Sequence, residues 1–323
     1  MYEFAPTPQA AQARLDLVNP KDYAHTRNAL DGAVTHLSPY LTHGFLSVPD
    51  IAYVMFHRHR LGVQHKLMFE LGWREYFQHL HQHHGDGIGA SLRDGILADA
   101  LYKREMPEDV LHACSRVPVV DHAVRMLYAT GYLHNNARLW LASYLVHLRK
   151  VHWRVGADWM YSHLLDGDVA SNDLSWQWVA GTGSSKPYLF NAANVAIHAP
   201  EPWHSKNTVM DQDMDIIDMI ARSRATFTQA SQAFASVQEP DLLSAPPPEA
   251  GLLPAGLAAD KLTDRAVWWI HPWSLSDKPP PAMPTDAMRV AACWHEWTQQ
   301  RPWSQMRWLF VSKGMHHLAS HCW

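Results

Sequence analysis

A helical repeat of apolar residues runs through the first two hundred residues and constrains the fold more than any other feature of the sequence. Apolar side chains recur every three or four positions in four segments, over residues 51–56, 67–80, 119–127 and 139–151. Strand-like alternation is scarce between residues 19 and 200, and proline and glycine fall between the segments. Ser38-Pro39 has the form of an N-cap followed by proline in the first turn. The sequence therefore predicts an all-α domain.

Prolines mark the end of this domain. Five of them lie between residues 239 and 254, a density typical of an extended linker. We predict three parts, which are a helical domain over residues 1–237, a proline-rich linker over 238–264 and a small, irregular, aromatic-rich extension over 265–323. Two further helices are predicted over residues 211–235 and 286–298, and we assign no chemistry to the extension.

Composition and charge narrow the classes of function. The chain has 47% hydrophobic and 18% charged residues, which is typical of a globular protein. Its formal net charge is −4, so any contact with nucleic acid has to come from a local basic patch. Three cysteines, Cys114, Cys293 and Cys322, are too few and too scattered for a disulfide framework. With no leader over residues 1–13 and no apolar run long enough to cross a bilayer, we expect a soluble, cytoplasmic protein without a membrane partner.

A dense histidine cluster raises the question of a metal site. His79 and His83 have the i, i+4 spacing of a metal-binding pair on a helix. No glutamate or cysteine completes a convincing set of ligands with them, and a solvated helix end explains the cluster more simply. We therefore predict no metal site.

Residues 166–178 carry the strongest chemical signal. They read Asp166-Gly-Asp-Val-Ala-Ser-Asn172 and end in Trp176-Gln-Trp178. Two carboxylates and an amide among small residues describe a loop in which polar groups approach a flat ligand closely while indoles close over it. The same spacing fits a capped turn before a buried pair of tryptophans, because Asp and Asn favour helix caps.

An amide and a guanidinium share one face of a predicted helix upstream of this segment. Asn135, Arg138 and Ala142 follow the i, i+3, i+7 rule. We expect Arg138 to pair with Asp166 beside the ligand, because a counter-charge keeps a carboxylate ionised in a dry site. An ordinary salt bridge between helices is the alternative for these two residues.

Six motifs, in their order and approximate spacing, resemble those of the photolyase and cryptochrome family. They are Tyr23-Ala-His-Thr-Arg27, Thr35-His-Leu-Ser-Pro-Tyr-Leu41, Glu70-Leu-Gly-Trp-Arg-Glu75, His134-Asn135 with Arg138, Trp153-Arg154, and Asp166 to Trp178. The resemblance covers residues 19–200 and implies an all-helical domain that holds a U-shaped FAD without a covalent bond. Because Tyr23 lies close to the first residue of this sequence, we expect no antenna domain before it.

The resemblance assigns a role to each matching residue around FAD. The pyrophosphate would be held by hydroxyl and backbone N–H groups of Tyr23, Thr35, Leu37 and Ser38. His36 stands where the family commonly has serine or arginine, and it would change the local charge of that site. The flavin ring would be lined by Asn135, Arg138, Asp166 and Asp168. Asn172 matches the position that faces N5 of the ring, where asparagine is typical of photolyases.

Two tryptophans match an electron-transfer chain that photoreduces the flavin in this family. Trp176 matches the indole nearest the flavin, and Trp153 matches the next one outward. The outermost tryptophan is missing from its expected place, where Tyr102 is a candidate surrogate. We expect photoreduction through Trp176 and Trp153, with the final donor left open.

Three residues match the substrate side of the family. Glu70, Trp73 and Trp178 stand where a carboxylate and two indoles hold a flipped pyrimidine dimer. The alternative is that both indoles simply fill the core. Contacts with DNA phosphates would come from three basic residues, Arg27, Arg74 and Lys186.

These matches lead to two hypotheses of different classes. The first is FAD-dependent, light-driven repair of cyclobutane pyrimidine dimers in damaged DNA, including single strands, by electron transfer from excited reduced flavin. Such a protein would be a carbon–carbon lyase resembling deoxyribodipyrimidine photolyase. The second is a cryptochrome-like blue-light photoreceptor that signals to a protein partner without repair. A flavoprotein that has lost both light functions is a third interpretation.

Overall fold

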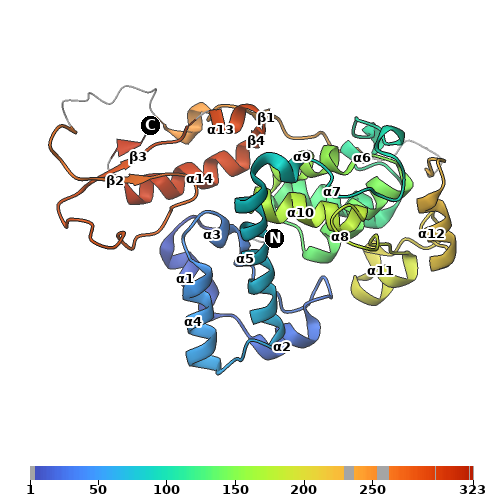
Figure 1. The fold of residues 1–323 in the computed structure, drawn as a ribbon, viewed down its shortest axis with the longest axis horizontal. Helices are drawn as coiled ribbons and strands as arrows, with labels where there is room; N and C mark the ends of the chain where they lie inside the picture. Colours follow the sequence, from blue (N-terminus) through green and yellow to red (C-terminus); the bar gives the residue numbers. More distant parts are fainter. Residues whose placement is uncertain (1–3, 229–235, 253–261, 295, 320, 323) are drawn as a thin grey trace.

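The computed structural model describes residues 4–228, 236–252, 262–294, 296–319 and 321–322. Helices dominate it, as predicted (Figure 1). Before the proline-rich segment the α-helices are α1 (Pro8–Asp16), α2 (Pro20–Thr26), α3 (Ser38–Thr42), α4 (Val48–His59), α5 (Lys66–His84), α6 (Glu108–Leu111), α7 (Pro118–Thr130), α8 (Asn135–Ser143), α9 (Trp153–His163), α10 (Val169–Ala180), α11 (Ala192–His198) and α12 (Met214–Arg222). The later elements are β1 (Leu242–Leu243), β2 (Val267–Ile270), β3 (Met288–Ala291), α13 (Glu296–Gln299), β4 (Trp303–Ser304), α14 (Gln305–Leu318) and β5 (His321–Cys322).

The four predicted helical segments are confirmed, and local signals explain their ends. At the start of α4 the Ser47 hydroxyl accepts a hydrogen bond from the Asp50 N–H, and the Asp50 carboxylate accepts one from Ser47, which is a capping box. The helix α7 is capped at its C-terminal end by Gly131, whose φ of 63° lies in the left-handed region. The segment over 139–151 is divided, because a π-helical turn, η3 (Tyr144–Leu148), follows α8, and its last three residues, 149–151, are not helical. At α3 the cap is Leu37, one residue before the predicted Ser38.

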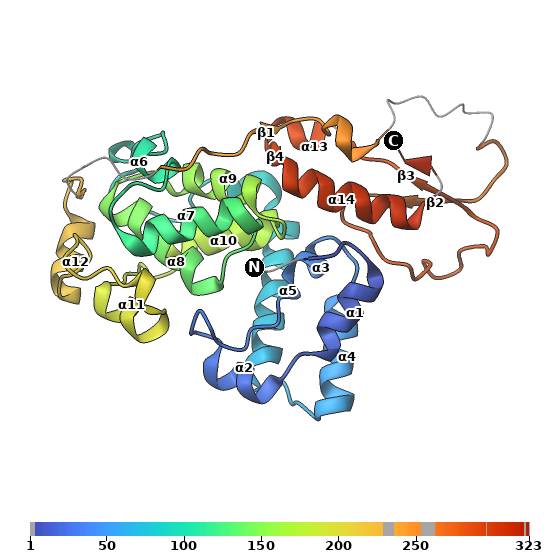
Figure 2. The same ribbon diagram turned by 180° about the vertical axis from the view of Figure 1, so that it is seen from behind.

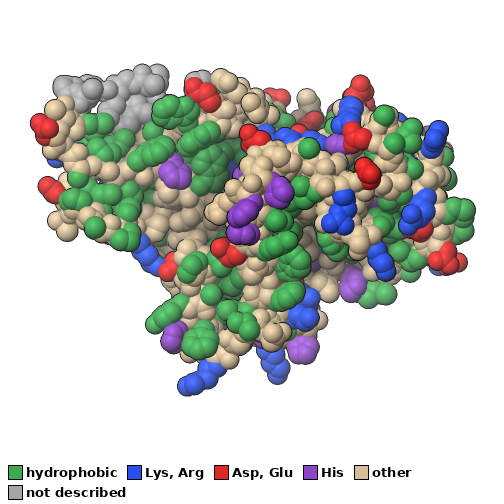
Figure 3. Space-filling model, in the orientation of Figure 1, with side chains coloured by type: hydrophobic (Ala, Val, Ile, Leu, Met, Phe, Trp, Pro, Cys, Tyr) green, Lys and Arg blue, Asp and Glu red, His purple; other side chains and the backbone are tan. Residues whose placement is uncertain are grey.

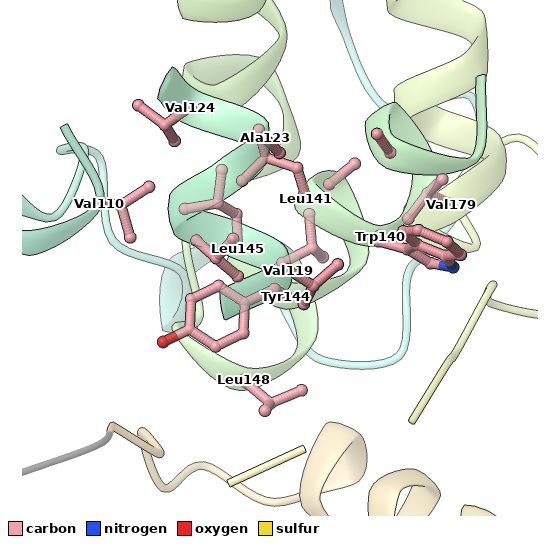
Figure 4. Packing of buried hydrophobic residues seen from close by; sticks show 14 of the residues in the cluster. Val110, Val119, Ala123, Val124, Trp140, Leu141, Tyr144, Leu145, Leu148 and Val179 are labelled. Carbon is pink, nitrogen blue, oxygen red and sulfur yellow. The ribbon is translucent and has the colours of Figure 1, made fainter. Parts of the chain in front are cut away.

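Two hydrophobic cores organise the molecule. The first joins α7, α8, η3 and α10, where Trp140 and Val179 are almost fully buried (Figure 4). The second joins Tyr40 of α3 with Trp303 and Trp308 from the C-terminal extension. Two opposite views show α14 beside α1 and α3 (Figures 1 and 2). The three-part division of the chain stays a prediction, and its first and last parts share this second core.

The extension contains a small sheet where we predicted a helix. The strand β3 pairs in parallel with β2 on one side and with β5 on the other. The helix predicted over residues 286–298 is therefore wrong, since Met288–Ala291 form β3 and only Glu296–Gln299 form a helix, α13. The reason is tertiary: two neighbouring strands supply backbone partners to both edges of β3, and this overrides the local periodicity.

The two remaining helices of this part of the chain also differ from expectation. The predicted helix over 211–235 is shorter than expected, because α12 ends at Arg222, and residues 229–235 lie outside the described residues. The 14-residue helix α14 was not predicted. Its start is capped by the Ser304 hydroxyl, which accepts a hydrogen bond from the Arg307 N–H at 3.3 Å.

Candidate cofactor site

A cavity of about 310 Å³ opens among α2, the loop before α3, α5, α8, α9 and α10. Its volume lies at the lower end of the range for small-molecule sites. Nine of the residues predicted to bind the cofactor line it, namely Tyr23, Thr35, His36, Ser38, Asn135, Arg138, Asp166, Asp168 and Asn172. Leu37 does not line it, and its side chain is buried in the second core. The helix α8 brings Asn135, Arg138 and Ala142 to the cavity together, as their spacing predicted.

The predicted pair of Arg138 and Asp166 is confirmed. Nη2 of Arg138 lies 3.0 and 2.7 Å from the two carboxylate oxygens of Asp166, and Nε donates to the main-chain oxygen of Leu133 at 2.9 Å. Burial acts to raise the pKa of the Asp166 carboxyl, but the Arg138 guanidinium outweighs burial and lowers this pKa. The pair therefore places an ionised carboxylate on the wall of the cavity.

Positive and negative side chains balance around the cavity. Besides Arg138, its lining contains Arg27, which lies 3.7 Å from Glu70, and Arg74, which lies 3.7 Å from Asp168. Each arginine thus faces one carboxylate. Of the three residues predicted to contact DNA phosphates, Arg27 and Arg74 therefore line the cavity and are already in ion pairs. Lys186 is exposed in the loop after α10.

Asp168 serves the local fold and the cavity at once. Its Oδ1 accepts a hydrogen bond from the Ser171 N–H at 2.7 Å and caps α10, while its Oδ2 accepts one from Gln78 at 2.6 Å. The capped turn that spacing alone allowed is therefore present, and the same carboxylate lines the cavity. The two interpretations of residues 166–178 do not exclude each other.

The residues before α3 form the other side of the cavity. His36 has a φ of 52°, which is uncommon for a residue other than glycine. Burial lowers the pKa of His36 to about 4, so its imidazole is neutral at pH 7. Burial and the nearby Glu70 raise the pKa of the Tyr23 phenol, so Tyr23 keeps its proton. This end therefore offers neutral hydroxyl and imidazole groups to a ligand.

One buried polar atom tests whether a ligand fits. The hydroxyl oxygen of Ser171 is buried without a hydrogen-bond partner among the described residues, although Ser171 lines the cavity. Buried polar atoms of folded proteins nearly always have a partner. The donors and acceptors gathered here suit a ligand with several polar groups on a flat ring, and FAD has that chemistry.

The two tryptophans of the predicted relay are buried. Trp176 lines the cavity, and Trp153 donates from Nε1 to the Ser91 hydroxyl at 2.9 Å. Gly156 is a further residue on which this arrangement depends, since a Cβ there would lie 2.3 Å from Cη2 of Trp176. Tyr102 lies near Trp153 through an intervening His152, with ring centroids 6.3 Å from Tyr102 to His152 and 5.7 Å from His152 to Trp153.

The substrate-side indoles lie at the surface. The exposed fraction is 44% for Trp73 and 43% for Trp178, so the interpretation that both fill the core is wrong. Trp73 lies on α5 between Glu70 and Arg74, which both line the cavity, and Trp178 lies on α10 two residues after Trp176. Neither indole is itself part of the cavity lining.

Sequence reasoning missed the contacts that the C-terminal extension makes with this site. Arg307 donates hydrogen bonds to the main-chain oxygens of Tyr161 and Gly167. His43 lies 2.7 Å from the main-chain oxygen of Leu165 and 2.6 Å from that of Pro272 in the extension. No local motif marks these residues, because their partners lie more than a hundred positions away in the sequence.

The imidazole rings of His79 and His83 lie 4.5 Å apart, centroid to centroid, but no group of three His, Cys, Asp or Glu side chains in the described part of the chain could hold a metal ion. None of the described helices is long and apolar enough to cross a membrane.

Comparisons with known proteins agree with this geometry. Residues 67–211 match the model of the FAD binding domain of DNA photolyase. A deoxyribodipyrimidine photo-lyase of Streptomyces griseus is 36% identical over 243 residues, which cover 65% of this chain and 51% of that protein. A cryptochrome DASH of Idiomarina loihiensis is 36% identical over 169 residues, which cover 50% of this chain and 38% of that protein. The chain thus spans about half or less of the length of these curated relatives.

Solved structures of photolyases and cryptochromes also resemble this chain. A cryptochrome of Synechocystis sp. PCC6803 has a TM-score of 0.52 and 29% identity over 59% of this chain and 43% of that one. An archaeal photolyase from Sulfolobus tokodaii, solved with two FAD molecules, has a TM-score of 0.54 and 25% identity over 66% of this chain and 50% of that one. Residues 67–211 therefore carry an FAD-binding domain of the DNA photolyase type, and the chain is similar in sequence and fold to photolyases and cryptochromes.

Proposed function

We propose that this chain repairs cyclobutane pyrimidine dimers in DNA with the help of light and a fully reduced FAD. The chemistry that FAD would supply is light-driven donation of one electron to the dimer, whose cyclobutane bonds then break, and return of that electron. The observation that carries the proposal is the exposure of Trp73 and Trp178 on two helices whose neighbouring residues line the cofactor cavity. Large indoles left half exposed beside a cavity are suited to stacking on a flat substrate.

The residues of the cavity would hold FAD in defined ways. Asp166, kept ionised by Arg138, would accept a hydrogen bond from an N–H of the flavin ring. The neutral groups of Tyr23 and His36 would face the polar backbone of the cofactor. Burial of the ring among α8, α9 and α10 would exclude water from it. FAD would be held by these contacts without a covalent bond to a histidine or cysteine.

An extruded dimer would find two kinds of contact at the mouth of the cavity. Stacking on Trp73 and Trp178 would contribute about 1 to 3 kcal/mol per base, which offsets part of the cost of leaving the DNA stack. Glu70 would accept hydrogen bonds from the N–H groups of the pyrimidines. Its side chain is 45% exposed and only 3.7 Å from Arg27, so it can turn toward a substrate without losing a buried partner.

Binding to the DNA backbone would be weak and local. Lys and Arg side chains are scattered over the face in Figure 3 among acidic and neutral ones, and the chain has a formal net charge of −4. Arg27, Arg74 and Lys186 would provide the phosphate contacts. With so few, a lesion in single-stranded DNA is the favoured substrate, because its extrusion costs the least free energy.

A photoreceptor is the second candidate, and one observation favours it. The extension presents exposed indoles at Trp269, Trp294 and Trp297, and its helix α14 contacts the loop at Gly167 through Arg307. A change in the redox state of the flavin could thereby reach a surface suited to a protein partner. On this reading the chain would signal without repairing DNA.

Purified protein would decide between the candidates. We would record its absorption spectrum and then assay repair of dimers in single-stranded DNA under blue light with the flavin reduced. Repair that needs light and FAD supports the lyase. A flavoprotein that photoreduces but restores no dimer, with substrate in excess, supports the photoreceptor, and a chain that remains colourless after addition of FAD contradicts both.

A further inference from the structure

Arg301 connects the C-terminal extension to the helix that carries Asn172. Its Nη2 lies 2.7 Å from Oδ2 of Asp173, and its Nη1 lies 3.4 Å from Oδ1. Asp173 is fully buried in α10, and Arg301 is the charged partner that compensates it. Arg301 also lies 3.4 Å from a carboxylate oxygen of Asp158, and its guanidinium is 5.3 Å from the centre of the Tyr161 ring.

The Asp173 carboxylate in turn orients Asn172. Nδ2 of Asn172 donates to Oδ1 of Asp173 and to the main-chain oxygen of Ala157, both at 3.0 Å. A carboxylate and a carbonyl can only accept, so the nitrogen of the amide, and not its oxygen, must face them. Both N–H groups are thereby used. The amide oxygen is what Asn172 has left to offer to the cavity that it lines.

We propose that Arg301 is a positioning residue that fixes Asp173, holds the Asn172 oxygen toward the cavity and so favours reduced over oxidised FAD. The inference rests on the placement of the flavin ring beside Asn172 in the proposed function. Reduction adds N–H donors to the flavin ring at nitrogens that are acceptors in the oxidised form. An acceptor oxygen aimed at the ring pairs with such a donor, whereas it faces an unpaired acceptor when the ring is oxidised.

Without Arg301 this orientation loses its support. A buried carboxylate whose charged partner is removed is strongly destabilised. Asp173 would relieve this by turning toward water. It then no longer accepts the hydrogen bond from Asn172, and the amide is free to turn its N–H groups to the cavity.

The midpoint potential of bound FAD tests the inference directly. We would measure it against a reference dye in the holoprotein for Arg301→Gln and Arg301→Lys, together with the dissociation constant for oxidised FAD and the melting temperature of the apoprotein. Arg289→Gln is the matched control, since Arg289 is an exposed arginine of the same extension that lies over the Trp268 ring.

We expect Arg301→Gln to lower the ratio of affinities for reduced and oxidised FAD about tenfold, which is about 30 mV for a two-electron couple. Arg301→Lys keeps the charge but loses the bidentate contact with Asp173, and it should shift the midpoint potential less. Arg289→Gln should leave the potential unchanged. If Arg301→Gln does not fold, the shift in Arg301→Lys carries the test.

A double substitution separates positioning from a mere change in charge. In an Asn172→Ala background, Arg301→Gln should produce no further shift, because the amide through which it acts is gone. An equal shift in that background, or an unchanged potential in both Arg301 variants, overturns the inference. If the Arg301 variants show these shifts in midpoint potential but the wild type repairs no dimer, the inference stands and repair is rejected. A wild-type protein that binds no FAD overturns both.

Discussion

Arg307 donates a 2.6 Å hydrogen bond from Nη2 to the main-chain oxygen of Gly167. The guanidinium is fully buried, and it also lies 4.3 Å from the centre of the Trp303 ring. A residue of the last long helix thereby holds the loop that carries Asp166 and Asp168. The shape of the cofactor site thus depends on the extension as well as on the helices that line it.

Gly167 should tolerate no side chain. A Cβ there would lie 2.4 Å from Nη1 of Arg307 and 2.6 Å from the main-chain oxygen of Tyr161. We expect Gly167→Ala to weaken FAD binding at least about tenfold, which corresponds to about 1.4 kcal/mol, because the loop has to shift. Fluorescence titration of the apoprotein with FAD measures this. Gly72→Ala on α5, where a Cβ meets nothing within 4 Å, should keep wild-type affinity, and equal affinities in all three proteins would contradict the account.

The pair of Arg138 and Asp166 should make stability depend on pH. A carboxyl whose pKa is lower in the folded protein stabilises the fold above its unfolded-state pKa, and this contribution is lost as the pH falls through the folded-state value. Asp166→Asn should therefore lower the free energy of unfolding at pH 7 by about 3 kcal/mol, since it leaves Arg138 without its partner. The difference from wild type should shrink below about pH 4.

Urea unfolding of the apoproteins at pH 7, 5 and 3.5 measures this difference. Asp218→Asn is the control, because Asp218 pairs with Arg222 on the surface of α12 and such pairs contribute little. A difference for Asp166→Asn that stays constant down to pH 3.5 would exclude the ion pair as its cause.

Spacing within one helix or one loop was enough to predict much of the site. Asn135 and Arg138 are three residues apart on α8, so any helix brings them to one face. The pairing of Arg138 with Asp166 followed from chemistry, because a buried carboxylate next to small residues needs a counter-charge. The helices themselves followed from apolar periodicity, which reports which face of each helix is buried.

What could not be predicted depends on residues distant in the sequence. Arg301 reaches Asp173 across 128 positions, and no local pattern distinguishes it from a surface arginine. The strand β3 forms because β2 and β5 lie on either side of it, while its own sequence also suits a helix. The exposure of Trp73 was likewise undecided, since an indole at its spacing packs inward or outward according to which helices cover it.

Photoreduction by an external thiol should be more sensitive to Trp176 than to Trp153. Trp176 lines the cavity and would make the first electron transfer to the excited flavin, whereas Trp153 would act one step later. Trp176→Phe should therefore slow the loss of flavin absorbance under blue light more than Trp153→Phe does. Trp140→Phe is the control, because Trp140 is equally buried but does not line the cavity. Wild-type rates in both relay variants would show that electrons reach the flavin by another route.

Repair and cofactor binding should separate at Glu70 and Trp178. Glu70→Ala removes a hydrogen-bond acceptor that lines the cavity, and Trp178→Ala removes an exposed indole, while the Arg138–Asp166 pair of the cavity is left in place. Each variant should keep near-normal flavin content. Loss of about 1 to 3 kcal/mol of stacking predicts roughly 5- to 150-fold weaker binding of dimer-containing DNA by Trp178→Ala.

Comparing damaged with undamaged DNA decides whether Glu70 and Trp178 contact the lesion. Trp269→Ala, which removes an indole exposed to 46% on the extension, should repair dimers at the wild-type rate. Affinity for undamaged DNA should be weak in every variant and fall steeply with salt, because it rests on few phosphate contacts. If Glu70→Ala and Trp178→Ala repair as fast as wild type, these residues do not contact the lesion. If Trp269→Ala alone loses activity, the extension takes part in binding DNA, and the surface near β2 replaces the mouth of the cavity as the place where the lesion is recognised.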